Sequence, residues 1–145
     1  MKQLNIALKN SCLCIMALFS GSCIFISCQN EKAPKLIGAW QIDSVFDFYN
    51  GFTFMDTNPT PREVHVYQPD KTMLRQGMGE EKVYYYELEG AQLFIRDLPN
   101  STIRNEQEII RLDSTQLVLR KNKKPQFEGK NQQRYELRYF SRLRP

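Results

Sequence analysis

The sequence predicts an all-β protein, an antiparallel up-and-down barrel of about eight strands that follows an N-terminal signal peptide. Three observations predict this. Short segments of alternating apolar and polar residues, bounded by turn residues, recur about every ten residues from Leu36 onward, with no helical period among them. The chain begins with two lysines and an uncharged apolar run. All four cysteines lie at or before position 28, so the barrel has no disulfide to support it.

Residues 1–27 have the layout of an export signal. Lys2 and Lys9 precede a run without any charge, residues 11–27. The alternative is a transmembrane helix, which needs roughly 20 apolar residues. This run is shorter and is interrupted by the Ser-Gly-Ser segment at 20–22, so we interpret it as a signal peptide.

The signal ends in a sequence that resembles a bacterial lipobox. Residues 25–27, Phe-Ile-Ser, place an apolar residue at minus three and a small one at minus one before Cys28. The resemblance implies that Cys28 is lipidated and anchors the mature protein to a membrane. Cys23 is a second candidate, but its minus-three position is polar and apolar residues still follow it.

A short polar segment, residues 28–34, is expected to tether the folded domain of residues 35–145 to that membrane. In enteric lipoproteins an aspartate after the cysteine commonly retains the protein at the inner membrane, and this chain has Gln29 instead. By that resemblance we expect an outer-membrane lipoprotein of a Gram-negative cell envelope. The periplasmic and the surface-exposed face both stay open.

The composition of the mature domain excludes several classes of function. Removal of residues 1–27 leaves 18 basic and 16 acidic residues, a net charge of +2, which argues against a nucleic-acid partner. His65 is the only histidine, and no hydrolase, phosphate-loop or catalytic-cysteine motif is present in the mature chain. We therefore expect no enzyme activity, no metal and no cofactor. His65 itself, between two valines, is expected to face solvent.

The expected strands follow one another along the mature chain. They are residues 40–46, 63–67, 72–76, 84–89, 93–96, 107–112, 115–120 and 135–143. Two segments, 88–96 and 112–120, share the pattern Leu-x-x-x-Gln-Leu-x-aliphatic-Arg, and each has the form of a hairpin end. A meander of this kind must protect its two edges, and closure into a barrel does so.

Alternation along the strands predicts which side chains face the interior. Tyr84 and Tyr86 are expected to point inward and Tyr85 outward. On the last strand the expected inner face is Tyr135, Leu137, Tyr139, Ser141 and Leu143, and the expected outer face is Glu136, Arg138, Phe140 and Arg142. An interior of about eight strands either fills with side chains or holds one small ligand.

Gly38-Ala39-Trp40 at the start of the first strand is similar to the Gly-x-Trp motif of lipocalins. Residues 35–42 look like the opening of the lipocalin-like domains of bacterial lipoproteins, and the resemblance spans most of residues 35–143. It implies that Trp40 caps the closed end and that an arginine near the last strand, Arg142, lies across its ring. The chain departs from the family at Asp70-Lys71, where Asp-Gly is common.

Three stretches are candidates for a functional site. The aromatic segment 46–61, which includes Phe52 and Phe54, can form a lid over a greasy ligand or plug the open end as extra core. The inward tyrosines can orient a polar ligand group or bond to the backbone. The basic segment 120–125, with Lys130 and Arg134, is a solvated hairpin end or a contact for anionic lipid.

These observations lead to a main hypothesis and two alternatives. In the first, the barrel binds a small apolar or amphipathic molecule, gated by the aromatic segment with Phe52 and Phe54, in a cavity lined by Tyr84, Tyr86, Leu93, Leu117, Leu137 and Tyr139. In the second, a solid barrel binds another envelope protein through an exposed patch that includes Phe94, Phe140 or the aromatic segment. In the third, one loop inserts into a hydrolase as an inhibitor.

Overall fold

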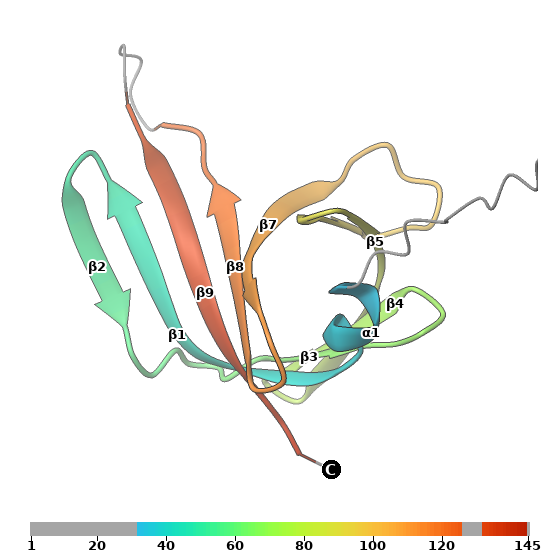
Figure 1. The fold of residues 1–145 in the computed structure, drawn as a ribbon. Helices are drawn as coiled ribbons and strands as arrows, with labels where there is room; N and C mark the ends of the chain where they lie inside the picture. Colours follow the sequence, from blue (N-terminus) through green and yellow to red (C-terminus); the bar gives the residue numbers. More distant parts are fainter. Residues whose placement is uncertain (1–31, 126–131, 145) are drawn as a thin grey trace, which may run out of the picture.

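The computed structural model describes residues 32–125 and 132–144, so the predicted lipidation site Cys28 lies outside the described residues. This part of the chain forms one short helix and nine strands (Figure 1). In chain order they are α1 (Lys32–Leu36), β1 (Gly38–Tyr49), β2 (Phe52–Asp56), β3 (Val64–Tyr67), β4 (Thr72–Gly77), β5 (Glu80–Glu89), β6 (Gln92–Arg96), β7 (Asn105–Leu112), β8 (Gln116–Asn122) and β9 (Arg134–Arg142).

Eight of these strands close into an antiparallel up-and-down barrel, which confirms the predicted fold class. The order is β1, β3, β4, β5, β6, β7, β8, β9, and β9 then pairs with β1. The ninth strand, β2, lies outside the ring. It pairs with residues 45–49 of β1, while β3 pairs with residues 38–41 on the same edge. Figure 1 shows β2 and the far halves of β1 and β9 standing beside the ring.

The β1–β2 hairpin is a strand pairing that the sequence interpretation did not include. Its turn is Asn50-Gly51, both with positive φ, 48° and 91°. Two consecutive residues of this conformation give the type I′ turn that matches the twist of paired strands, and Asn-Gly is its most favourable sequence. The segment that follows is therefore a strand, Phe52–Asp56, rather than a loop.

The closed end of the barrel is filled by apolar side chains. Leu36, Trp40, Leu93, Leu117 and Phe140 are fully buried there. Helix α1, which the alternation pattern does not predict, covers this end, and the Nε1–H of Trp40 donates to the Leu36 carbonyl at 2.8 Å. The buried core, helix α1 and the strand pairs that close the ring are all formed by residues 32–125 and 132–144.

Arg142 joins the last strand to the start of the first. Its guanidinium carbon lies 4.1 Å from the centre of the Trp40 ring, which is the cation–ring contact that the lipocalin resemblance implies. Nη1 donates to the Ile37 carbonyl at 2.9 Å, and Nη2 donates to the Lys35 carbonyl. The guanidinium thereby fixes the chain that enters β1 against the end of β9.

The predicted faces of β9 are wrong. Phe140 and Glu136 are buried inside the barrel, whereas Leu137 and Tyr139 are only partly buried and lie on the outer face. The register places Tyr139 beside Val118, which is also outside the core cluster. The physical reason is that the charged residues of β9 form ion pairs inside the barrel, so the polar face is the inner one.

Two further predicted positions differ from the structure. His65 is not solvent-facing: its side chain points inward, with 4% of its surface exposed, against Phe140 at a ring distance of 5.0 Å. Phe94 does face outward, but it is buried beneath Arg104, whose guanidinium carbon lies 3.9 Å from the ring centre. Phe94 and Phe140 therefore contribute nothing to an exposed patch.

The β3–β4 turn contains Asp70-Lys71. One carboxylate oxygen of Asp70 accepts from the backbone N–H of Thr72 at 3.0 Å and from its hydroxyl at 2.6 Å. These hydrogen bonds hold the pKa of Asp70 below its ordinary value. Lys71 has φ +67°, the left-handed region in which the glycine of an Asp-Gly turn is unstrained.

Candidate functional site

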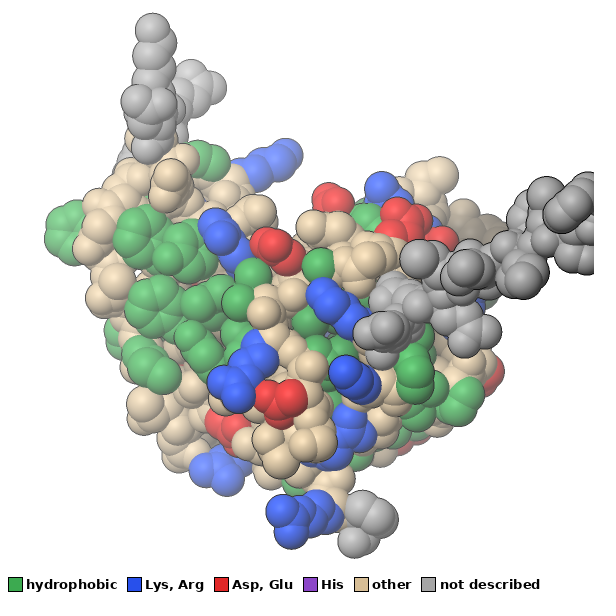
Figure 2. Space-filling view, in the orientation of Figure 1, with side chains coloured by type: hydrophobic (Ala, Val, Ile, Leu, Met, Phe, Trp, Pro, Cys, Tyr) green, Lys and Arg blue, Asp and Glu red, His purple; other side chains and the backbone are tan. Residues whose placement is uncertain are grey.

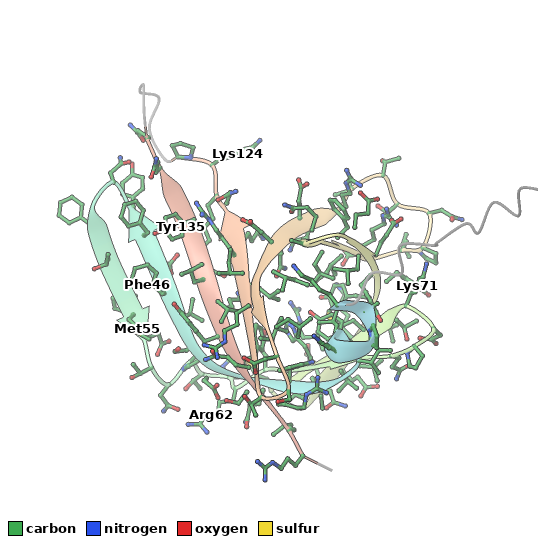
Figure 3. The ribbon with its side chains drawn as sticks, viewed as in Figure 1. Phe46, Met55, Arg62, Lys71, Lys124 and Tyr135 are labelled. Carbon is green, nitrogen blue, oxygen red and sulfur yellow. The ribbon has the colours of Figure 1, made fainter. Side chains whose placement is uncertain are left out.

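The end of the barrel opposite Trp40 contains an open pocket of about 740 Å³. It lies between β4 to β8 and the loops that leave β6 and β8. Its lining includes five cationic side chains, Arg75, Lys82, Arg104, Lys121 and Lys124. Figure 3 shows Lys124 beyond the end of β8 and Lys71 away from it, in the turn between β3 and β4. We call this space the mouth pocket.

Apolar and aromatic side chains form the floor of the mouth pocket. Tyr84 and Ile95 line it from β5 and β6, and both are buried members of the core cluster. Tyr84 pairs with Met73 across β4 and β5, so its ring rests on the filled half of the barrel. The pocket therefore ends where the solid core begins.

Two cations lie directly on the Tyr84 ring. Arg75 and Lys82 are the cross-strand pair two positions beyond Met73 and Tyr84 toward the mouth, so they share the inner face with that pair. The Arg75 guanidinium carbon is 5.1 Å from the centre of the Tyr84 ring, and Lys82 Nζ is 5.0 Å from it. A smaller adjoining pocket of about 350 Å³ shares both cations. The floor is thus an aromatic ring flanked by positive charge.

The mouth pocket carries an excess of positive charge. Asp97 and Glu106 are its two acidic lining residues, against five cations. Asp97 lies 3.8 Å from Lys82 Nζ, but both side chains are largely exposed, so water screens this pair strongly. A concave site with an excess of one sign of charge attracts ligands of the opposite sign.

A chain of ion pairs crosses the inner wall beside the mouth. Lys123 Nζ lies 2.9 Å from an Asp47 carboxylate oxygen and also contacts Glu136. The other oxygen of Glu136 accepts from Arg138 Nε. Burial raises the pKa of Glu136, but the bonds from Lys123 and Arg138 outweigh it and leave that pKa below its ordinary value. Glu136 is therefore a buried carboxylate.

The same chain continues to His65. Arg138 Nη1 is 3.9 Å from Glu63, and His65 Nε2 is 3.3 Å from the same Glu63 oxygen. Burial lowers the pKa of His65 more than Glu63 raises it. The imidazole is consequently neutral at pH 7, and the geometry assigns the proton to Nε2, which donates to Glu63. His65 Nδ1 has no hydrogen-bond partner among the described residues.

The structure separates the eight residues that the sequence hypothesis groups around a ligand. Tyr84 lines the mouth pocket. Tyr86, Leu93 and Leu117 belong to the filled core, and the Tyr86 hydroxyl donates to the Gln68 carbonyl at 2.8 Å. The remaining four lie on outer surfaces or beyond the ring: Leu137, Tyr139, Phe52 and Phe54.

Sequence reasoning missed the cations of the mouth pocket. Arg75 lies two positions after the inward Met73, and Lys82 lies two positions before the inward Tyr84. Alternation of period two therefore places both charges on the inner face. The alternation that places Arg75 and Lys82 inside was therefore visible in the sequence. Long charged side chains at the ends of strands, however, usually point to solvent.

Residues 32–125 and 132–144 contain no group of three or more His, Cys, Asp and Glu side chains arranged to hold a metal ion. Within the same ranges, no helix has the length and apolar character needed to span a bilayer.

Comparison with known proteins found no match to this chain among protein-family models, curated proteins or solved structures. What the structure establishes is an eight-stranded antiparallel barrel with an additional strand, a fold compatible with that of a lipocalin-like ligand-binding protein. The closed end, with Gly38, Trp40 and Arg142, and the mouth pocket are the features on which a function can be argued.

Proposed function

We propose that this protein is a lipocalin-like envelope lipoprotein whose mouth pocket binds a small amphipathic anion. The observation that carries the proposal is the combination of an aromatic and aliphatic floor, Tyr84 and Ile95, with five cations around it. Ligand sites in proteins are concave, largely apolar and equipped with a few placed polar groups. The mouth of a barrel is one of their usual positions.

The arrangement favours one orientation of such a ligand. Its apolar part rests on Tyr84 and Ile95, and its anionic group lies among Arg75, Lys82 and Lys121. The closed half is filled by side chains, which leaves no room for a long tail at the depth of Trp40. A short chain with a carboxylate, sulfate or phosphate group fits this description.

Membrane anchorage is the second part of the proposal. The lipobox-like Phe-Ile-Ser-Cys sequence that ends at Cys28 supports it, since the folded unit begins at Lys32, a few residues later. We propose acylation of Cys28 and an outer-membrane location. Expression of Cys28→Ser in a Gram-negative host with radiolabelled palmitate tests this, because the variant should lose the label and keep its signal peptide. Unchanged labelling would refute lipidation at Cys28.

The ligand proposal is tested with three compounds of equal chain length and different charge. Calorimetric titration of the folded chain from residue 29 onward with decanoate, decanol and decyltrimethylammonium should give the tightest binding for decanoate. Arg75→Gln combined with Lys82→Gln should weaken decanoate binding about tenfold, at roughly 0.5–1 kcal/mol for each partly solvated charge.

The matched control variant removes two positive charges at the closed end instead of in the mouth pocket. Lys35→Gln with Lys71→Gln removes two cations far from the mouth pocket and should leave decanoate binding unchanged. Equal affinity for the three compounds, or equal weakening in both double variants, would contradict the proposed site.

A further inference from the structure

The β1–β2 hairpin exposes large apolar side chains that the barrel does not use. Phe52 is 79% exposed, Phe54 68% and Met55 52%, three residues of one five-residue strand. Figure 2 shows hydrophobic side chains gathered over the part of the molecule that β1, β2 and β9 form, with Lys and Arg side chains beside them. Large apolar patches on a soluble surface mark sites of interaction.

Both faces of the hairpin carry large apolar side chains. On the outer face Phe46 pairs with Met55 and with Leu137, and Phe48 stacks on Tyr135 at a ring distance of 4.8 Å. Figure 3 shows Phe46, Met55 and Tyr135 on these neighbouring strands.

On the opposite face of the hairpin, Phe52 pairs with Tyr49 and Phe54 pairs with Asp47. Most of the surface of both phenylalanines is exposed to solvent. A rigid partner would cover one face of a strand pair, whereas a fluid apolar medium surrounds both faces.

Two arginines lie on aromatic rings beside the turn end of the hairpin. Arg120 lies over the Tyr135 ring at 4.4 Å, and Arg134 lies near the Tyr49 ring at 6.0 Å. Of the neighbouring carboxylates, Asp47 and Glu136 both bind Lys123, and Asp56, at the end of β2 away from the turn, accepts a hydrogen bond from the Asn58 backbone N–H. Aromatic side chains with arginines at their rim are typical of segments that lie at the water–lipid boundary.

We propose that the β1–β2 hairpin inserts into the interfacial region of a lipid bilayer that carries anionic headgroups. Phe52, Phe54 and Met55 enter the boundary between headgroups and acyl chains, and Arg120 and Arg134 contact the headgroups. The outer edge of β2 pairs with no other described strand, and the hydrated headgroup region can satisfy its backbone groups. This goes beyond ligand binding in the mouth pocket and does not depend on it.

The charge distribution favours lipid over a second copy of the chain. Arg134 and Arg120 lie on β9 and β8, one and two strands beyond β1 from the hairpin side, so a bilayer surface that covers the hairpin reaches them, whereas an edge-to-edge pairing of two β2 strands would leave both arginines outside the contact. An anionic lipid surface instead attracts each nearby Arg or Lys by about 1 kcal/mol.

Flotation with vesicles tests the proposal. The folded chain from residue 29 onward, which lacks the apolar run 11–27 and contains helix α1 and all nine described strands, is mixed with phosphatidylcholine vesicles or with vesicles that contain 30 mol% phosphatidylglycerol. The protein should float with the anionic vesicles and much less with the neutral ones. Phe52→Ser combined with Phe54→Ser should reduce the partition coefficient at least tenfold.

The matched control removes two equally exposed apolar side chains elsewhere. Met78, 82% exposed, and Leu98, 66% exposed, lie outside the hairpin and outside the mouth pocket, so Met78→Ser with Leu98→Ser should keep full vesicle binding. Thermal unfolding and decanoate titration should be unchanged in the Phe52 and Phe54 double variant. This separates loss of membrane contact from misfolding and from failure of the ligand proposal.

Three outcomes would overturn the proposal. They are no flotation of the unaltered protein with either vesicle, equal flotation of the hairpin and control variants, and a dimer in sedimentation equilibrium that only the hairpin variant loses. The last result would assign the hairpin to a second copy of the chain.

Discussion

Gly38 lies directly beneath the guanidinium of Arg142, and a Cβ atom at position 38 would lie 2.6 Å from Nη1. The backbone of Gly38 also has φ +127°, a conformation that other residues rarely adopt. The glycine of the Gly-x-Trp segment is therefore explained by the arginine that crosses the Trp40 ring. The three residues form one structural unit at the closed end.

Gly38→Ala is expected to lower the free energy of unfolding by about 2–3 kcal/mol, because it combines backbone strain with displacement of Arg142 from its carbonyl partners. The change in the free energy of unfolding is measured by urea denaturation, monitored through Trp40 fluorescence. Gly90→Ala is the control, since Gly90 has φ +60° but a Cβ there meets no atom within 4 Å. Equal losses in the two variants would show that the contact with Arg142 contributes nothing.

Lys71→Gly is expected to stabilise the barrel by about 1 kcal/mol. Lys71 adopts φ +67° in the β3–β4 turn, where a side chain costs energy and glycine does not. Lys71→Ala removes the same charge but keeps the strained Cβ, so its stability should stay near that of the unaltered protein. Chemical denaturation compares the free energy of unfolding of the three proteins. If Lys71→Ala were also stabilising, the effect would come from loss of the charge and not from relief of backbone strain.

Glu136→Gln is expected to destabilise the protein by roughly 2–4 kcal/mol, because it leaves Lys123 and Arg138 without their buried anionic partner. Glu80→Gln, at an exposed position of β5, should change stability by less than about 0.5 kcal/mol. Urea titrations at pH 7 supply both values. A loss in Glu136→Gln no larger than that of the control would refute a structural role for the ion-pair chain.

The stability of the protein is expected to fall as the pH drops below about 6.5. Burial holds the pKa of His65 below its ordinary value of 6.5, so the unfolded chain binds a proton in this range while the folded chain does not. Thermal unfolding between pH 7.5 and pH 5.0 measures the effect.

His65→Phe is the companion variant in that experiment and should show a flatter pH profile. Glu63 and Glu136 have lowered pKa values, so their contribution is lost only below about pH 4.5 and does not interfere. A profile with the same slope in both proteins would mean that His65 is not the responsible group.

Alternation in the sequence was sufficient for the fold class but not for every strand face. It predicts β5 correctly, because Tyr84 and Tyr86 are buried and Glu87 is not. It fails on β9, where Glu136 and Arg138 form ion pairs inside the barrel and Tyr135 stacks on Phe48 outside it. A rule that assigns charge to solvent cannot foresee charges that neutralise one another across strands.

The mouth pocket was harder to predict than the fold, because it too is formed by charged side chains that point inward. The mouth pocket depends on Arg75 and Lys82 pointing inward, and their position follows from the register of β4 with β5. The β1–β2 hairpin, in contrast, was within reach of the sequence. Asn50-Gly51 between aromatic segments is a strong local signal for a hairpin, and recognising it would have placed Phe52 and Phe54 on a strand.

Strand β1 is part of both the closed ring and the β1–β2 hairpin, and these two parts differ in how cooperatively they unfold. From residue 38 to residue 41 it is part of the closed ring, and from residue 45 onward its second neighbour is β2, which has no other strand partner among the described residues. Amide groups that bond only within the hairpin can therefore exchange with solvent through a local opening, while those of the ring exchange through global unfolding. The end of the protein that we assign to the membrane is thus able to rearrange without loss of the barrel.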